Sequence, residues 1–247
     1  MKISKRVGVI GCGAIGIIIA EAFERRILRC DELILYDYEL ERAEKLKSQL
    51  RFPARVVLSL DEMLKLNPKA IVEAASQQAA RDYLGKILAE DIDIIVMSTG
   101  ALVGLNLKTS RVHVPSGAIG GLDALSAATM AGVDEIVLTT RKNPKSLDVN
   151  WTEEKLVYEG DAEDASRLFP REMNVAATLA LAVKPVPVKV RVVSDPLVHR
   201  NTHEIYVKWR FGEMFLRFAN DPHPENPRTS ALAAWSAISL LKKLLEK

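Results

Sequence analysis

The chain has only two cysteines, Cys12 and Cys30, among its 247 residues. They provide neither a disulfide framework nor the paired spacing of a metal site, so we expect a cytoplasmic protein without a bound metal. Cys12 lies between two glycines of a glycine-rich stretch. We interpret it as filling a position in that loop, not as a reactive thiol.

The chain also lacks a large charge excess and any very long apolar run. Its net charge is +2 at pH 7, and no block of Lys and Arg alternates with aromatic residues as a nucleic-acid groove requires. No segment has the length of a membrane span, and the stretch Met1–Arg6 leads into a strand instead of a signal peptide. We therefore expect neither a nucleic-acid nor a membrane partner.

Hydrophobic residues make up 48% of the chain, which suits either one large α/β unit or two modest domains. In the first part, short apolar runs alternate with helical patterns. Strands are expected at 7–10, 33–36, 55–58, 70–72 and 92–97, and helices at 15–25, 39–50, 61–66 and 77–89. This alternation predicts a doubly wound parallel sheet that binds its ligand at the carboxyl ends of the strands.

The pattern changes after about residue 108. Strands are expected at 111–115, 135–140, 189–194, 204–211 and 213–218, and helices at 123–130, 174–183 and 230–244. Short turns between the late strands, including a hairpin around Gly212, predict a mostly antiparallel sheet. The last helix is so apolar that it must pack on the first domain or on a partner subunit.

We therefore predict an α/β protein with two domains. A Rossmann-type dinucleotide-binding domain spans residues 1–108 and is completed by a C-terminal helix at 229–247. A second α/β domain for substrate binding and dimerisation spans 109–228. The apolar surface of residues 186–193 and of the last helix favours a homodimer.

A glycine-rich loop follows the first strand and opens the first helix. It consists of Gly11, Cys12, Gly13, Ala14, Ile15 and Gly16. In this pattern the first glycine permits a tight turn, the second lets a pyrophosphate approach the backbone, and the third lets the helix pack on the strand. The helix N-terminus adds partial positive charge. The loop predicts a nicotinamide dinucleotide site, against the alternative of a structural turn.

Asp37 ends the second strand, where its carboxylate can accept hydrogen bonds from the adenosine ribose and repel a 2′-phosphate. This position favours NAD. The alternative is a cap of the helix that follows at Glu39, and the nearby Arg42 leaves NADP possible.

Three further loops follow strands and are candidates for cofactor contacts. Small residues that let a cofactor lie against the backbone are Ala75, Ser76, Ser98 and Thr99. The stretch Ser116, Gly117 and Ala118 can offer backbone N–H groups to a carboxylate or to the nicotinamide amide. The alternatives are helix caps and tight turns for the first two loops and an interdomain hinge for the third.

His199 and His203 lie four residues apart. Pro196 and the β-branched residues after His203 oppose a helix there, and no third ligand is near, so a metal site is not indicated. The pair can instead provide an acid and a base. We interpret His113 and His223 as structural.

The order of several motifs resembles the L-aspartate dehydrogenase family over nearly the whole chain. The motifs are the glycine loop, Ser98–Ala101, Pro115–Ala124, Lys142–Leu147, Leu168–Ala176, Asn201–Ile205 and Asn226–Ser230. The resemblance implies a dinucleotide domain, a substrate domain that forms a homodimer, and NAD or NADP as cofactor. It also implies His203 as the catalytic residue, with cofactor contacts from Ser116–Ala118 and Asn174.

The family reaction oxidises L-aspartate to iminoaspartate, which hydrolyses to oxaloacetate and ammonia or enters NAD biosynthesis. One imidazole with a pKa near neutrality can manage the protons. The two substrate carboxylates need cationic partners, for which the candidates are Lys145, Arg171, Arg200 and Arg228. The alternatives are a dihydrodipicolinate reductase or homoserine dehydrogenase type of enzyme, and a dinucleotide-sensing protein without activity.

Overall fold

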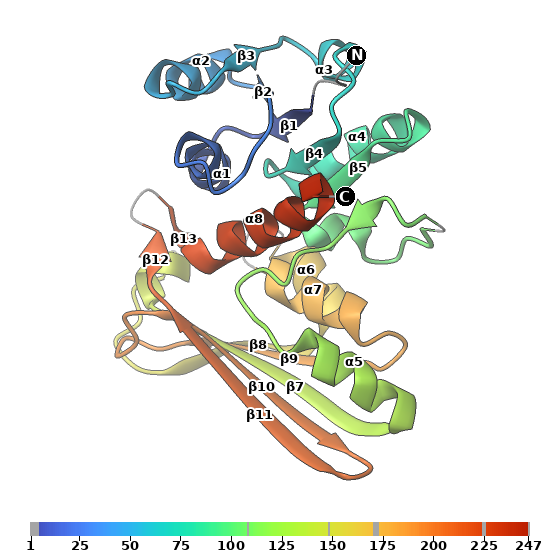
Figure 1. The fold of residues 1–247 in the computed structure, drawn as a ribbon. Helices are drawn as coiled ribbons and strands as arrows, with labels where there is room; N and C mark the ends of the chain where they lie inside the picture. Colours follow the sequence, from blue (N-terminus) through green and yellow to red (C-terminus); the bar gives the residue numbers. More distant parts are fainter. Residues whose placement is uncertain (1–4, 108, 148, 170–172, 224–225, 247) are drawn as a thin grey trace. The chain divides into compact units, whose positions relative to one another are not determined.

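The computed structural model describes residues 5–107, 109–147, 149–169, 173–223 and 226–246, without the side chains of 222–229. The chain divides into two units (Figure 1). The first unit contains the residues up to Ala101, residues 105–115, and the residues from Ala233 onward. The second contains residues 102–104 and 116–232. No helix among the described residues is long and apolar enough to cross a membrane.

The first unit is built on a six-stranded sheet in which neighbouring strands are all parallel. Its strands, in the order β3-β2-β1-β4-β5-β6 across the sheet, are β1 Arg6–Ile10, β2 Glu32–Tyr36, β3 Ala54–Val56, β4 Ala70–Glu73, β5 Asp93–Val96 and β6 Val112–His113. The helices are α1 Ala14–Glu24, α2 Leu40–Gln49, α3 Leu60–Lys65, α4 Gln77–Ala89 and the greater part of α8 Ala231–Glu246. The predicted doubly wound sheet is confirmed.

Two elements of this unit come from late or unexpected parts of the chain. Residues 109–115, expected at the start of the second domain, instead belong to the first unit and contain β6, which pairs with β5 through Ile94 and Val112. The buried face of α8 joins the core of this unit through Ala237, Ile238, Leu241, Leu244 and Leu245. Of the two partners expected for the apolar helix, the structure shows the first domain.

The second unit is built on a five-stranded sheet in the order β11-β10-β7-β9-β8. Its strands are β7 Val133–Lys142, β8 Lys155–Asp161, β9 Lys189–Ser194, β10 Asn201–Trp209 and β11 Gly212–Asn220. β7 and β9 pair in parallel, and the other neighbouring pairs are antiparallel, so the predicted mostly antiparallel sheet is confirmed. A short pair, β12 Pro222–His223 and β13 Asn226–Ser230, follows.

Helices α5 Leu122–Ala131, α6 Ala162–Leu168 and α7 Asn174–Ala182 lie over one face of this sheet (Figure 1). Beneath them, Leu138, Val190 and Ile205 form the core together with apolar side chains of the helices. On β10 the buried residues His203, Ile205 and Val207 alternate with less buried ones. This pattern confirms the strand alternation expected from His203 onward, because successive side chains of a strand point to opposite faces.

Candidate functional site

The glycine loop connects β1 to α1, and its geometry accounts for its glycines. Gly11 has a φ of 94°, and a Cβ atom there would lie 2.6 Å from the Ala74 carbonyl oxygen. A Cβ at Gly16 would collide with the Gly11 carbonyl oxygen, whereas a Cβ at Gly13 would meet nothing within 4 Å. The loop therefore packs tightly at both ends and leaves open space at its centre, which fits a pyrophosphate at the helix N-terminus.

Asp37 holds the glycine loop in place through hydrogen bonds, and the Cys12 thiol within that loop is buried. Asp37 accepts the backbone N–H of Cys12 at 2.7 Å and that of Glu39 at 2.9 Å, so it ties the glycine loop to the turn before α2. Each carboxylate oxygen accepts one of these bonds and keeps capacity for another donor, such as a ribose hydroxyl. Burial, with a smaller effect of Asp37, raises the pKa of the Cys12 thiol to about 12.

The buried carboxylate of Glu73, at the end of β4, organises the next two loops. It accepts four hydrogen bonds: from the backbone N–H groups of Ala75, Ser76 and Ser98, and from the Ser98 hydroxyl at 2.9 Å. Burial raises the pKa of Glu73, and these hydrogen bonds counteract that rise. The sequence indicated the loops but not this acid.

These hydrogen bonds also show which structural roles the residues of the two loops have. The donors of Ala75, Ser76 and Ser98 point to Glu73, and the Ser76 hydroxyl accepts from Ala79 as the N-cap of α4. The helix cap and tight turns named as the alternative are thus present in these two loops, and the small residues of both loops stay candidates for cofactor contacts. Thr99 is buried at the start of a short 3₁₀ helix, Thr99–Leu102.

His203 lies near the N-terminal end of β10 in the sheet of the second unit, and it is 3% exposed. Its Nδ1 is 3.0 Å from the hydroxyl oxygen of Thr140 on β7, the residue opposite it in the strand register. Burial, with a smaller effect of the Lys142 ammonium, lowers the pKa of His203 from 6.5 to about 3. The expected pKa near neutrality is therefore wrong for the unliganded protein, whose imidazole is neutral at pH 7.

The same end of the sheet gathers other candidate residues of this unit. Asn220 of β11, paired with Asn201, donates to the backbone carbonyl of Ala118 at 3.0 Å. This contact places the stretch Ser116–Ala118 at the end of the sheet where His203 lies. Gly117 has a φ of 67°, a conformation that favours glycine. Asn174 is the first residue of α7 and is half-buried.

The other charged candidates are more exposed. Lys145, Arg200 and the exposed His199 line a cavity of about 810 Å³. Arg200 is paired with Asp221 at 2.8 Å. Arg171 lies outside the described residues, as does the side chain of Arg228. His113 contacts Asp93 through Nε2 at 2.7 Å between neighbouring strands, a structural role.

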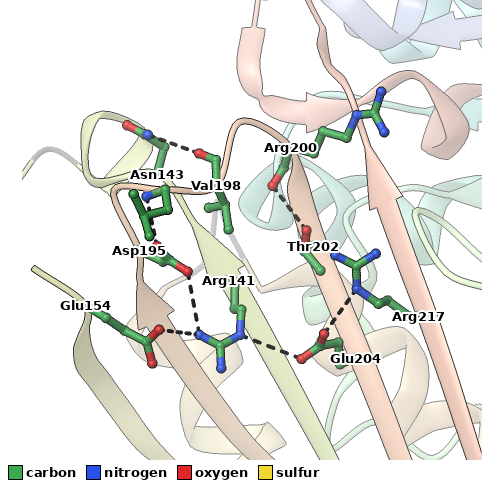
Figure 2. Close-up of polar contacts among 10 residues, drawn as sticks. Arg141, Asn143, Glu154, Asp195, Val198, Arg200, Thr202, Glu204 and Arg217 are labelled. Carbon is green, nitrogen blue, oxygen red and sulfur yellow. Dashed lines mark hydrogen bonds and ion pairs between the residues drawn. The ribbon is translucent and has the colours of Figure 1, made fainter.

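A network of ion pairs on the opposite face of the same strands holds the segment that leads into β10. Figure 2 shows the guanidinium of Arg141 reaching Glu154 at 2.8 Å, and Asp195 and Glu204 at 3.7 Å each. Glu204 in turn contacts Arg217 at 3.2 Å. Asp195 also accepts the backbone N–H of Leu197. Arg141 therefore links β7, β10 and the β9–β10 connection on the sheet face opposite to that of His203.

Comparisons with known proteins agree with both units. The family model described as "Homoserine dehydrogenase, NAD binding domain" matches residues 11–111, and the model described as "Aspartate dehydrogenase, C-terminal" matches residues 123–244. L-aspartate dehydrogenases of Methanothermobacter thermautotrophicus and Archaeoglobus fulgidus are each 42% identical to the chain, over 97% of it and over 96% and 98% of their own lengths.

A Rossmann-type sheet of this kind together with these relatives defines an NAD(P)-dependent oxidoreductase. The crystal structure of an aspartate dehydrogenase from Thermotoga maritima superposes with a TM-score of 0.74 at 30% identity, covering 97% of this chain and 96% of that one. The chain belongs to the aspartate dehydrogenase family.

Proposed function

We propose that the protein is an L-aspartate dehydrogenase that uses NAD or NADP and oxidises aspartate to iminoaspartate. The observation that supports this most strongly is the buried imidazole of His203, which lies within hydrogen-bond distance of Thr140 and near a buried lysine, Lys142. A neutral imidazole can take a proton, and the buried cation suits an anionic substrate.

A nicotinamide dinucleotide held by the glycine loop and Asp37 would supply the acceptor for the hydride that leaves the substrate Cα. When Nδ1 of His203 carries its proton and donates to Thr140, Nε2 is free to accept a proton from the substrate amine. Loss of that proton and of the hydride leaves a C=N bond. The imidazole then releases this proton to solvent, accepts a proton from the water that adds to the C=N carbon, and returns it to the nitrogen, so that ammonia leaves and oxaloacetate remains.

The test is NADH consumption by the purified protein with oxaloacetate and ammonia, and NADH formation with L-aspartate. Parallel assays with homoserine, other amino acids and other 2-oxo acids separate this function from that of related dehydrogenases. Turnover of homoserine or of a monocarboxylic amino acid in preference to aspartate would overturn the proposal, and so would binding of NADH without any turnover.

Asp37 sets the choice between NAD and NADP in this proposal. We expect Asp37→Ser to raise the ratio of NADP to NAD catalytic efficiency, because the carboxylate that repels a 2′-phosphate is removed. The variant also loses the carboxylate acceptor of the Cys12 N–H, so both cofactors are expected to bind somewhat more weakly. Steady-state kinetics with each cofactor measure the ratio, and an unchanged ratio would leave Asp37 only its structural role.

We also propose a homodimer, but through a different surface from the one that the sequence suggested. The residues first expected to be exposed are internal: Val188, Val190 and Val192 lie in the core of the second unit, and α8 lies in that of the first. The open face of the second unit's sheet instead carries Phe215, 64% exposed, beside Tyr206 in the strand register. In the proposed dimer, Phe215 and Tyr206 pack against the partner subunit.

We expect light scattering at micromolar concentration to give the mass of a dimer. Phe215→Glu should shift the protein toward monomer, because it replaces the exposed aromatic of the proposed interface by a charge. Leu58→Glu, which changes an exposed residue of the first unit, is the matched control and should leave the mass unchanged. A monomeric wild-type protein would refute the dimer.

A further inference from the structure

The covered face of the second unit's sheet changes from apolar to polar at one end. Leu138 and Ile205 belong to the core, whereas the next residues on the same face are Thr140 and His203, which pair with each other. One step further, Lys142 of β7 pairs with Ser194 of β9. Because residues two apart on a strand share a face, Lys142 and Ser194 lie on the same side of the sheet as His203.

The third member of this row is Asn201. Thr202 pairs with Arg141, and since β7 and β10 are antiparallel, Asn201 falls beside Lys142. The three side chains of this row are all buried: Ser194 is 0%, Lys142 2% and Asn201 4% exposed. An ammonium, a hydroxyl and an amide thus lie side by side next to the imidazole.

Of the three residues in this row, Ser194 indicates most clearly that a ligand binds here. Its hydroxyl oxygen is buried and has no hydrogen-bond partner among the described residues. A buried hydroxyl without a partner costs about 1–3 kcal/mol, so such groups in native proteins usually serve a ligand or a bound water. The hydroxyl lies one strand away from the Lys142 ammonium and can donate to the same anion.

The structure assigns Lys142, Ser194 and Asn201 as the subsite that holds one carboxylate of the dicarboxylic substrate beside His203. This assignment rests on the proposed function for the identity of the substrate. The three groups supply one charged and two neutral donors, which match the acceptor positions of a carboxylate. Lys145 and Arg200 are more exposed cations that line the cavity described above, to which Asn201 also contributes.

The electrostatics of His203 agree with this assignment. The Lys142 ammonium contributes to the low pKa of the imidazole, about 3. A carboxylate bound to Lys142 offsets that charge and makes a protonated imidazole less costly. The substrate itself would thereby help His203 to hold the proton that it takes from the amine.

The experiment compares wild type with Lys142→Met and Ser194→Ala, and with Lys184→Met as a control at an exposed position. Two quantities are measured: KM for L-aspartate against kcat, and the calorimetric Kd of succinate, a dicarboxylate without an amine, for the NAD-bound protein. Lys142→Met should raise both KM and the succinate Kd by about ten-fold or more. Ser194→Ala should raise both several-fold while the unfolding temperature stays equal or increases, because the hydroxyl has no partner to lose.

The outcomes separate this assignment from the proposed function. If wild type oxidises aspartate but both variants bind succinate as wild type does, the carboxylate subsite is wrong and the function stands. If wild type binds succinate and Lys142→Met does not, yet aspartate is not oxidised, the subsite stands and the substrate is another carboxylate. Wild type that neither binds succinate nor oxidises aspartate overturns both, and an equal effect of Lys184→Met overturns the subsite.

Discussion

His203→Ala should reduce the rate of aspartate oxidation by about 10²–10⁴-fold, the usual effect of removing a positioned acid or base. The affinity for NADH should stay near that of wild type, because the glycine loop and Asp37, which are expected to bind the dinucleotide, are unchanged. His199→Ala is the matched control: this exposed histidine lies four residues away, and its loss should leave most activity. Stopped-flow or steady-state kinetics together with NADH fluorescence titration measure both quantities.

The pH profile provides a second test of His203. A base with a pKa lowered to about 3 is neutral at higher pH and is lost only as the pH falls through that value. The acid limb of kcat/KM, which reports the free enzyme, should therefore lie well below the ordinary histidine value of 6.5. A limb near 6.5 that disappears in His203→Ala would contradict the burial effect, and equal losses in the two alanine variants would show that the histidines act as a pair.

Glu73→Gln should lower the free energy of unfolding by about 2–4 kcal/mol, because at least two buried donors lose a proper acceptor. An amide has only one acceptor oxygen, and its NH₂ group would face backbone N–H groups that now donate to the carboxylate. Because Glu73 holds the loops at Ala75 and Ser98, the variant should also bind NADH more weakly. Urea unfolding and fluorescence titration measure the two effects.

The control for this prediction is Glu90→Gln, the same substitution at an exposed residue that follows α4. It should change neither stability nor cofactor affinity beyond experimental error. Wild-type stability in Glu73→Gln would mean that the loops keep their conformation without the carboxylate, and the positioning role of Glu73 would then be discarded.

The fold was predictable where hydrophobic periodicity was strong. The parallel strands of the first unit and strand β9 were expected at or close to their observed positions, since buried strands are continuous apolar runs. β8 and α6 were missed: β8 is a mostly exposed edge strand, and α6 is short with several charged residues, so neither has a clear periodic pattern. β6 was assigned to the wrong unit because two residues pair too briefly to identify their sheet.

The candidate site was predictable only in part, for a physical reason. The glycine loop and His203 belong to local motifs, whereas Glu73 and Lys142 act through neighbours that are distant in sequence. In the sequence, Glu73 merely ends an apolar run, and Lys142 resembles a surface charge at the end of a strand. The strand register that buries these two charges is the information that a single sequence does not contain.

The position of α8 has a consequence for how the protein forms during synthesis. The ribosome releases the glycine loop early, yet five buried residues of that unit's core lie in the last helix. The second unit, residues 102–104 and 116–232, is complete when the synthesis of α8 has only begun. We therefore expect the second unit, which contains His203, to fold on the nascent chain before α8 completes the core of the first unit, since domains generally fold as their sequences become available.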